Sequence, residues 1–344
     1  MIRSLYRRST LGIRMAIFNA DVGLDSRTLD IFDRFDEAVA VTGRTFDRYS
    51  VRFSNGDSAS VNGFEFFYPG NMYPSFGTVM SISRHTGGEW VYSIVLDLDQ
   101  TDMGPYFSAN PLDVNKEIFA GDDQVNGSSF KDYINGWSGA DRLVGGHGSD
   151  TYVVDNRHDT VVELKDQGTD LVKSYVSFSL AGQFIEKLTL IGHDAINASG
   201  NSLANLIKGN SAANTIKGNG GADVLVGGPG RDVLTGGDGA DRFVFRAVDD
   251  SDVGRKVRDQ ITDFTSGHDL IDLSSIQAVS GAIRDEAFGF IGSDAFSHRA
   301  GELRAVRVGP STVLEGDVTG DARADFQILL RDVMADLHAS DFVL

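Results

Sequence analysis

The sequence predicts a mainly β protein built around a stack of short strands, on three observations. Asp or Asn recurs every nine residues in two stretches of the chain. Glycines stand in phase between these residues, and an apolar residue follows two positions after each. The 344 residues include 40 Gly and 6 Pro, and 40 of the 49 acidic residues are Asp, which favours turns and cation sites over helices.

The two repeat series cover residues 117–154 and 197–246. In each copy six residues of Gly-rich turn precede three of strand, and because side chains alternate along a strand, only the middle strand residue points inward. The apolar ladder is narrow, so its burial at about 25 cal/mol per Å² contributes little against the entropy of fixing many glycines. The predicted core residues are Val125, Ile134, Leu143, Tyr152, Ile207, Ile216, Leu225, Leu234 and Phe243.

Another interaction must therefore hold the turns, and the Asp residues supply it. Carboxylates and turn carbonyls are hard oxygen ligands, which suit calcium better than zinc or copper. A bound Ca²⁺ would offset the repulsion among stacked carboxylates, so its binding energy would appear as folding energy. The alternative is that each Asp only bonds to its own backbone in a turn. The phased glycines favour the calcium ligand at Asp150, Asp223, Asp232 and Asp241, and both interpretations stay open for Asp123 and Asp132.

Three segments carry a family resemblance. GGHGSDTYV (145–153), GGPGRDVLT (227–235) and GGDGADRFV (236–244) resemble the nonapeptide repeat GGxGxDxUx of the RTX (repeats-in-toxin) calcium-binding family. The resemblance implies a parallel β-roll, in which two nonapeptides make one coil and calcium lies between turns eighteen residues apart. The metal-binding residues that it implies are Gly136, Gly139, Asp141, Gly145, Gly146, Gly148, Asp150, Gly218, Gly221, Asp223, Gly227, Gly228, Gly230, Asp232, Gly236, Gly237, Gly239, Asp241, Asp259 and Asp263.

The implied geometry grades the sites of the second series. Turns 218–223 and 236–241 face each other, and both carry Gly and Asp, so Asp223 with Asp241 is the best-formed predicted site. Turn 227–232 would face a turn whose Asn214 lacks the charge, which leaves Asp232 to find a partner further along the chain.

Fewer well-formed ions are expected in the first series. Turn 145–150 would face a turn that Phe130 and Lys131 interrupt. In turn 136–141, Trp137 stands where the second Gly belongs.

Residues 155–196 alternate as short strands do, and we expect linking coils there without calcium turns. Residues 247–344 resemble the C-terminal domain of serralysin-type (peptidase M10) metalloproteases and other type I secreted proteins. That resemblance implies that Asp259 and Asp263 complete or cap the last calcium sites; two polar caps without calcium are the equal alternative. It also implies an uncleaved export signal at the C-terminus, with Asp341 to Leu344 as its tail.

The N-terminal region, residues 1–116, is expected to form a small, mainly β module. Residues 26–40 have the apolar spacing of a helix, and SNG (54–56) and TGG (86–88) are hairpin turns between alternating segments. Residues 1–14 stand outside the module in one interpretation, in which translation begins at Met15 or the start is disordered. Their apolar part is interrupted by Arg14, so no cleaved signal peptide is expected.

Catalytic motifs are missing from the sequence. It contains no HExxH, GxSxG or P-loop pattern, and HTGGE at His85 is not a zinc motif. Asp97, Asp99 and Asp102 could flank a sugar, but solvated strand-end charges or an extra cation site are favoured. Core packing is likewise favoured over a glycan-stacking face for the aromatic residues Phe64, Phe66, Phe67, Tyr68 and Tyr73. The sequence thus favours a binding or adhesion module for surface glycan or matrix, with a small secreted hydrolase as the alternative.

Composition excludes several classes. The absence of Cys excludes disulfides and thiolate metal sites, and no apolar run reaches the length of a membrane-spanning helix. The net charge of −18 disfavours nucleic acid as a partner. Together with the resemblance, these features predict an extracellular Ca²⁺-binding protein that the type I secretion machinery exports.

Overall fold

The computed structural model describes residues 121–127, 131–281, 286–334 and 336–344, together with the backbone of six strands before them. The described chain is mainly β, with only two short 3-10 turns, η4 (Val248–Asp250) and η5 (Ala339–Asp341). It forms two compact units, residues 1–171 and 172–344. No helix in these ranges is long and apolar enough to cross a membrane.

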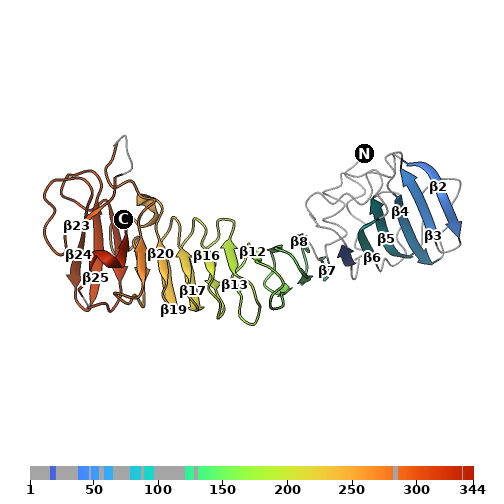
Figure 1. Cartoon of the computed structure of the whole chain (residues 1–344), viewed down its shortest axis with the longest axis horizontal. Coiled ribbons are helices and arrows are strands. Elements are labelled where there is room, and N and C mark those ends of the chain that lie inside the picture. Colours follow the sequence, from blue (N-terminus) through green and yellow to red (C-terminus); the bar gives the residue numbers. More distant parts are fainter. Residues whose placement is uncertain are drawn as a thin grey trace, which may run out of the picture. The chain divides into compact units, whose positions relative to one another are not determined.

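The N-terminal strands form an antiparallel arrangement in the order β2, β3, β4, β5, β6, β1 (Figure 1). The pairs β3–β4 and β5–β6 enclose the SNG and TGG segments, as hairpin turns require. Residues 38–40, the end of the predicted helix, lie in β2 instead, and residues 26–37 are outside the described ranges. The strands are β1 (Ala16–Ala20), β2 (Ala38–Thr45), β3 (Arg48–Phe53), β4 (Ser58–Phe64), β5 (Thr78–Thr86) and β6 (Glu89–Leu96).

The first repeat series folds into short parallel strands that alternate between two sheets. β9 pairs with β7 and β11, whereas β10 pairs with β8. Partners are eighteen residues apart, as in Val125 opposite Leu143, so two nonapeptides make one coil. The strands are β7 (Gln124–Asn126), β8 (Tyr133–Asn135), β9 (Arg142–Val144), β10 (Thr151–Val154) and β11 (Thr160–Val162).

The second unit repeats this arrangement. One row of parallel pairs runs through β14, β16, β18, β20 and β22, and another through β13, β15, β17, β19 and β21. The strands are β12 (Leu171–Ser174), β13 (Phe178–Ser179), β14 (Lys187–Leu190), β15 (Ala198–Ser199), β16 (Leu206–Lys208), β17 (Thr215–Gly220), β18 (Val224–Val226), β19 (Val233–Asp238) and β20 (Arg242–Val244). Residues 124–243 thus form a parallel β-solenoid of about 6 turns, which confirms the predicted β-roll.

The C-terminal part closes both rows of the second unit. β26 pairs parallel to β21 and antiparallel to β25, which pairs antiparallel to β24. The last strand, β27, pairs parallel to β22, so the end of the chain belongs to a sheet. These strands are β21 (Asp259–Ile261), β22 (Leu270–Asp272), β23 (Gly289–Phe290), β24 (Glu302–Val308), β25 (Ser311–Asp317), β26 (Phe326–Leu330) and β27 (Phe342–Val343).

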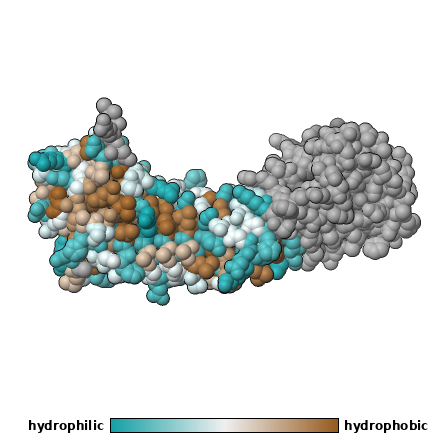
Figure 2. Space-filling model, viewed as in Figure 1, coloured by the Kyte–Doolittle hydropathy of each residue, from teal (hydrophilic) through white to brown (hydrophobic). Residues whose placement is uncertain are grey.

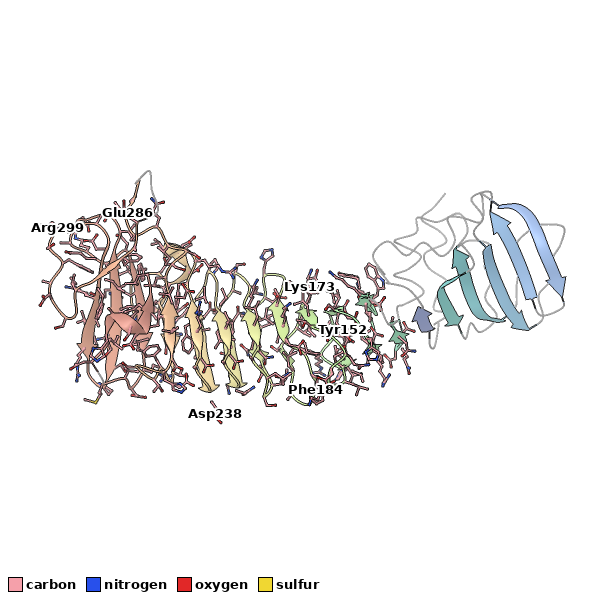
Figure 3. All side chains as sticks on the ribbon, viewed as in Figure 1. Tyr152, Lys173, Phe184, Asp238, Glu286 and Arg299 are labelled. Carbon is pink, nitrogen blue, oxygen red and sulfur yellow. The ribbon has the colours of Figure 1, made fainter. Side chains whose placement is uncertain are left out.

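The core is the narrow ladder that the repeats predict. All nine predicted core residues are at most 2% exposed. Tyr152, for example, is fully buried, whereas Asp238 is exposed and points away from the roll (Figure 3). The visible surface of the described residues is largely hydrophilic, with brown apolar patches between teal residues (Figure 2).

The coils stack too closely for side chains at some turn positions. A Cβ added to Gly239 would overlap the carbonyl oxygen of Gly221, in the turn eighteen residues earlier. Gly239 also has a φ of +142°, which side chains disfavour. The third glycine of the repeat is therefore required by close backbone approach as well as by turn geometry.

Candidate metal centre

Aspartates of successive turns form a ladder along each edge of the roll. The backbone N–H of Asp223 donates to Oδ1 of Asp241, 2.9 Å away and eighteen residues further along the chain. The N–H of Asp132 donates in the same way to Asp150 Oδ1 at 2.8 Å. One carboxylate oxygen of each such Asp therefore joins its coil to the preceding coil.

The second oxygen of these carboxylates is buried and has no hydrogen-bond partner among the described residues. Their side chains belong to residues that are at most 2% exposed. A buried carboxylate oxygen without a partner is unfavourable, because it has lost water and gained no donor. The six aspartates with such an Oδ2 atom are Asp141, Asp150, Asp223, Asp232, Asp241 and Asp259.

The first glycine of each turn makes room for this oxygen. A Cβ added to Gly136 would overlap Oδ2 of Asp141, and one added to Gly218 would overlap Oδ2 of Asp223. Gly145, Gly227 and Gly236 stand in the same relation to the aspartates five residues after them. The spacing Gly-x₄-Asp therefore has a steric cause that does not depend on the conformation of the glycine.

The other predicted glycines hold the turns open. All have positive φ, as a tight Gly-rich turn requires. They are Gly139, Gly146, Gly148, Gly221, Gly228, Gly230, Gly237 and Gly239. Trp137, at the second glycine position of its turn, is held at φ +60°, which is costly for a side chain of its size.

The structure brings together the aspartates that were graded highest. Asp223 and Asp241 are consecutive in one ladder. Asp232 accepts from the N–H of Asn214 at 2.7 Å, and its own N–H donates to Asp259 Oδ1 at 2.7 Å. Asp259 is thus the partner further along the chain, and its place in the ladder agrees with completion of a site.

Asp263 is placed differently from Asp259. Its Oδ1 accepts from the N–H of Gly236 at 3.0 Å, and its Oδ2 accepts from the N–H of Gly237 at 2.8 Å. Both oxygens already have donors, so the geometry of Asp263 fits a polar cap better than a calcium ligand.

Asn205 and Asn214 take the place of aspartates in the ladder, whose successive positions we call rungs, and their uncharged side chains have hydrogen-bond partners. Asn205 Oδ1 accepts from the N–H of Asn201 at 2.8 Å, and its amide donates to the carbonyl of Ile185 at 2.9 Å. The amide of Asn214 donates to the carbonyl of Ile196 at 2.7 Å. The amide NH₂ supplies a donor to the preceding coil that a carboxylate lacks, so these positions bury no charge that a cation would have to balance.

The repeat pattern does not reveal three members of the ladder. Insertions lengthen the interval to Asp170 and Asp269, whereas Asp159 keeps the interval of eighteen residues but ends a turn without glycine. Asp141 N–H donates to Asp159 Oδ1 at 3.0 Å, Asp150 N–H to Asp170 Oδ1 at 2.7 Å, and Asp241 N–H to Asp269 Oδ1 at 3.0 Å. Asp159 and Asp269 use the second oxygen as well, to accept backbone N–H groups of their own turns. These two residues therefore cap their ladders.

Burial without a hydrogen-bond donor raises the pKa values of the ladder aspartates. Removal from water raises the pKa of Asp141 to about 8, of Asp223 to about 7 and of Asp259 to about 9, and neighbouring carboxylates add to the effect. A divalent cation would reverse it by stabilising the ionised form. Charge, burial and hard oxygen chemistry all fit Ca²⁺ at these six aspartates.

Stability of the calcium-free chain is expected to fall as the pH rises. The folded pKa values lie above the ordinary 3.8, so the fold binds more protons than the unfolded chain. Its contribution to stability is complete near pH 4 and is lost as the pH rises through about 7 to 9. The β structure that chelator-treated protein keeps in far-UV circular dichroism should therefore be greater at about pH 5.5 than at about pH 8.

Saturating calcium provides the control, because bound carboxylates lose stability on acidification and the sign reverses. A calcium-free β signal that stays constant or rises from about pH 5.5 to about pH 8 would contradict the assignment of buried, proton-binding carboxylates.

Comparisons with known proteins agree with this geometry. Residues 118–152 match the family described as RTX calcium-binding nonapeptide repeat (4 copies), and residues 193–344 match the family described as peptidase M10 serralysin C terminal. No curated protein matches the chain.

Two solved structures are similar over part of the chain. One is the solution structure of the AlgE6R3 subunit from the Azotobacter vinelandii mannuronan C5-epimerase, at 24% identity over 53% of this chain and 82% of that chain, with a TM-score of 0.29. The other is the crystal structure of extracellular lipase LipA from Serratia marcescens, at 16% identity over 65% and 38%, with a TM-score of 0.22. On the family matches and its motifs, the chain carries RTX calcium-binding nonapeptide repeats and a C-terminal domain of the serralysin (peptidase M10) type.

Proposed function

We propose that this chain is a secreted calcium-binding RTX protein whose β-roll folds when it meets extracellular Ca²⁺. The observation that carries the proposal is the row of buried Oδ2 atoms, on six ladder aspartates, without a hydrogen-bond partner among the described residues. A cation beside each of these aspartates would supply the positive partner that the buried Oδ2 atom lacks. Because the unfolded chain has no such preformed rungs, binding energy becomes folding energy.

The calcium affinity that this role needs is weak. Extracellular calcium modules bind with dissociation constants of about 10⁻⁴ to 10⁻³ M. At that affinity the roll stays unfolded in a cytosol poor in calcium and folds outside the cell. An unfolded chain is also the form that an export channel can pass.

The C-terminal tail supports the same order of events. In the folded protein Asp341 is fully buried, and its carboxylate accepts from the N–H of Gly267 and the hydroxyl of Ser266, both at 2.8 Å. Phe342 pairs with Ile271 in the sheet. A tail held in this way is available to the type I secretion machinery only before the roll folds.

Residues 1–116 act in this proposal as a binding or adhesion module for surface glycan or matrix. The basis is the sequence, which offers a strand-rich module and no catalytic motif. The aromatic and acidic side chains singled out there lie outside the described residues. Hydrolytic turnover abolished by Asp97→Asn would favour a small secreted hydrolase instead.

Calcium titration of the full chain, followed by far-UV circular dichroism and calorimetry, tests the folding role. We expect a cooperative gain of β structure at about millimolar calcium, with several ions bound, and its loss on chelation. A spectrum that neither chelator nor calcium changes would contradict the proposal.

Export tests the role of the tail. In a bacterial host that carries a type I transporter for serralysin-type proteins, deletion of residues 341–344 should remove the protein from the medium. Deletion of residues 1–14 is the control and should leave export intact. Export that depends on residues 1–14 and not on the tail would refute this route.

A further inference from the structure

The turn after the first repeat series carries a residue that the repeat does not predict. β11 pairs with β9 with Val162 opposite Val144, so the next residue, Glu163, stands opposite Gly145. A glutamate therefore replaces the first glycine of the turn, and Asp170 closes the turn twenty residues after Asp150. Residues 163–170 lie outside both family matches.

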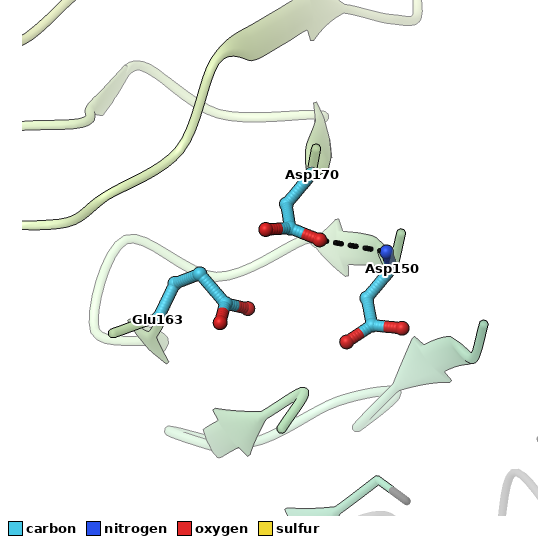
Figure 4. A group of neighbouring side chains, drawn as sticks. All are labelled: Asp150, Glu163 and Asp170. Carbon is cyan, nitrogen blue, oxygen red and sulfur yellow. Dashed lines mark hydrogen bonds between the residues drawn. The ribbon is translucent and has the colours of Figure 1, made fainter. Parts of the chain in front are cut away.

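Three carboxylates of this region converge in the interior of the roll (Figure 4). Asp150, Glu163 and Asp170 each offer an oxygen, and these oxygens lie within 4.8 Å of one another. All three residues are at most 2% exposed. The hydroxyl of Tyr152 donates to Glu163 Oε2.

One buried oxygen atom of this cluster has no hydrogen-bond donor in the described part of the chain, which indicates a bound ligand. Oδ2 of Asp150 is buried and has no hydrogen-bond partner among the described residues. It is aimed into the cluster, since a Cβ added to Gly145 would overlap it and would also contact Glu163 Oε2 at 2.9 Å. A buried carboxylate oxygen beside two further carboxylates is stable only with a positive charge or a proton between them.

We propose that Glu163 and Asp170 of the linking segment join Asp150, the aspartate of the last nonapeptide turn of the first series, in binding one Ca²⁺ ion through three carboxylates. Three convergent carboxylates and a tyrosine oxygen form a hard oxygen set of the kind that calcium accepts in irregular geometry. Mg²⁺ fits less well, because it keeps several waters and demands an octahedron, whereas these groups are buried. The site rests on the proposed function at Asp150 and extends it, since two of its three carboxylates belong to the linking segment, where no calcium turn is predicted.

The number of calcium ions bound by the full chain at saturation tests the site. Glu163→Gln keeps an acceptor for Tyr152 and removes one charge, and Asp170→Asn keeps an acceptor for the N–H of Asp150. Each variant should bind one ion fewer than the unmodified chain. The matched control is Asp166→Asn, which removes an exposed acid from the same turn at a positive φ that Asn tolerates.

Equal ion numbers in Glu163→Gln, Asp170→Asn and the unmodified chain would overturn the site and show that the cluster shares protons instead. The double variant Asp223→Asn, Asp241→Asn separates this outcome from failure of the proposed function. If only the double variant binds fewer ions than the unmodified chain, the repeat sites are supported and the site at Glu163 is overturned. If the unmodified chain binds no calcium, both proposals are overturned.

A second measurement applies if Glu163→Gln loses the circular dichroism of the folded chain. Tb³⁺ replaces Ca²⁺ and emits when a nearby tyrosine is excited, and Tyr152 contacts the cluster. The emission of the Tb³⁺-loaded chain should fall in Tyr152→Phe, which keeps the buried ring. Unchanged emission would overturn the site.

Discussion

The structure depends on one oxygen atom in each calcium-type turn. Each ladder aspartate uses Oδ1 to accept a backbone N–H from the preceding coil, and that bond sets the stacking of the coils. The fold then buries Oδ2 of the same carboxylate beside a glycine that leaves room for it. The same residue therefore stabilises the stack by one atom and destabilises it by the other. A narrow apolar ladder cannot offset many such atoms, so the roll needs cations or protons at its rungs.

Asparagine at these positions avoids the buried oxygen without a donor, because its side chain carries both an acceptor and a donor. At Asn205 and Asn214 the amide oxygen accepts a backbone N–H of its own turn, and the NH₂ donates to the preceding coil. Such rungs carry no charge and leave no buried oxygen without a donor. The second repeat series thus begins with Asn rungs whose amides have partners and continues with Asp rungs whose Oδ2 atoms have no hydrogen-bond partner among the described residues. We therefore expect calcium dependence to be distributed unevenly along the roll.

Much of this arrangement could be predicted from the sequence. The nine-residue period gave the buried ladder from Val125 to Phe243 and the pairing of turns eighteen residues apart, because one repeat fixes both side-chain direction and coil length. Insertions hid the rest: Asp170 and Asp269 join the ladder at intervals of twenty and twenty-eight residues, where no fixed period can find them. Glu163 was missed because its role depends on register opposite Gly145. The spacing of residues also does not show that Oδ1 accepts a hydrogen bond while Oδ2 has no donor among the described residues, because this difference depends on the geometry of the folded chain.

The exchange of the two rung types tests this account most directly, by the amount of β structure that the calcium-free chain keeps in far-UV circular dichroism. Asn214→Asp removes the donor to Ile196 and buries a charge, so it should destabilise the calcium-free chain by roughly 1–3 kcal/mol. Asp223→Asn removes a buried charge and should stabilise the calcium-free chain, while it loses stabilisation by saturating calcium. Opposite signs for the two variants are the result that the account predicts. Equal destabilisation by both, in the absence of calcium, would contradict it.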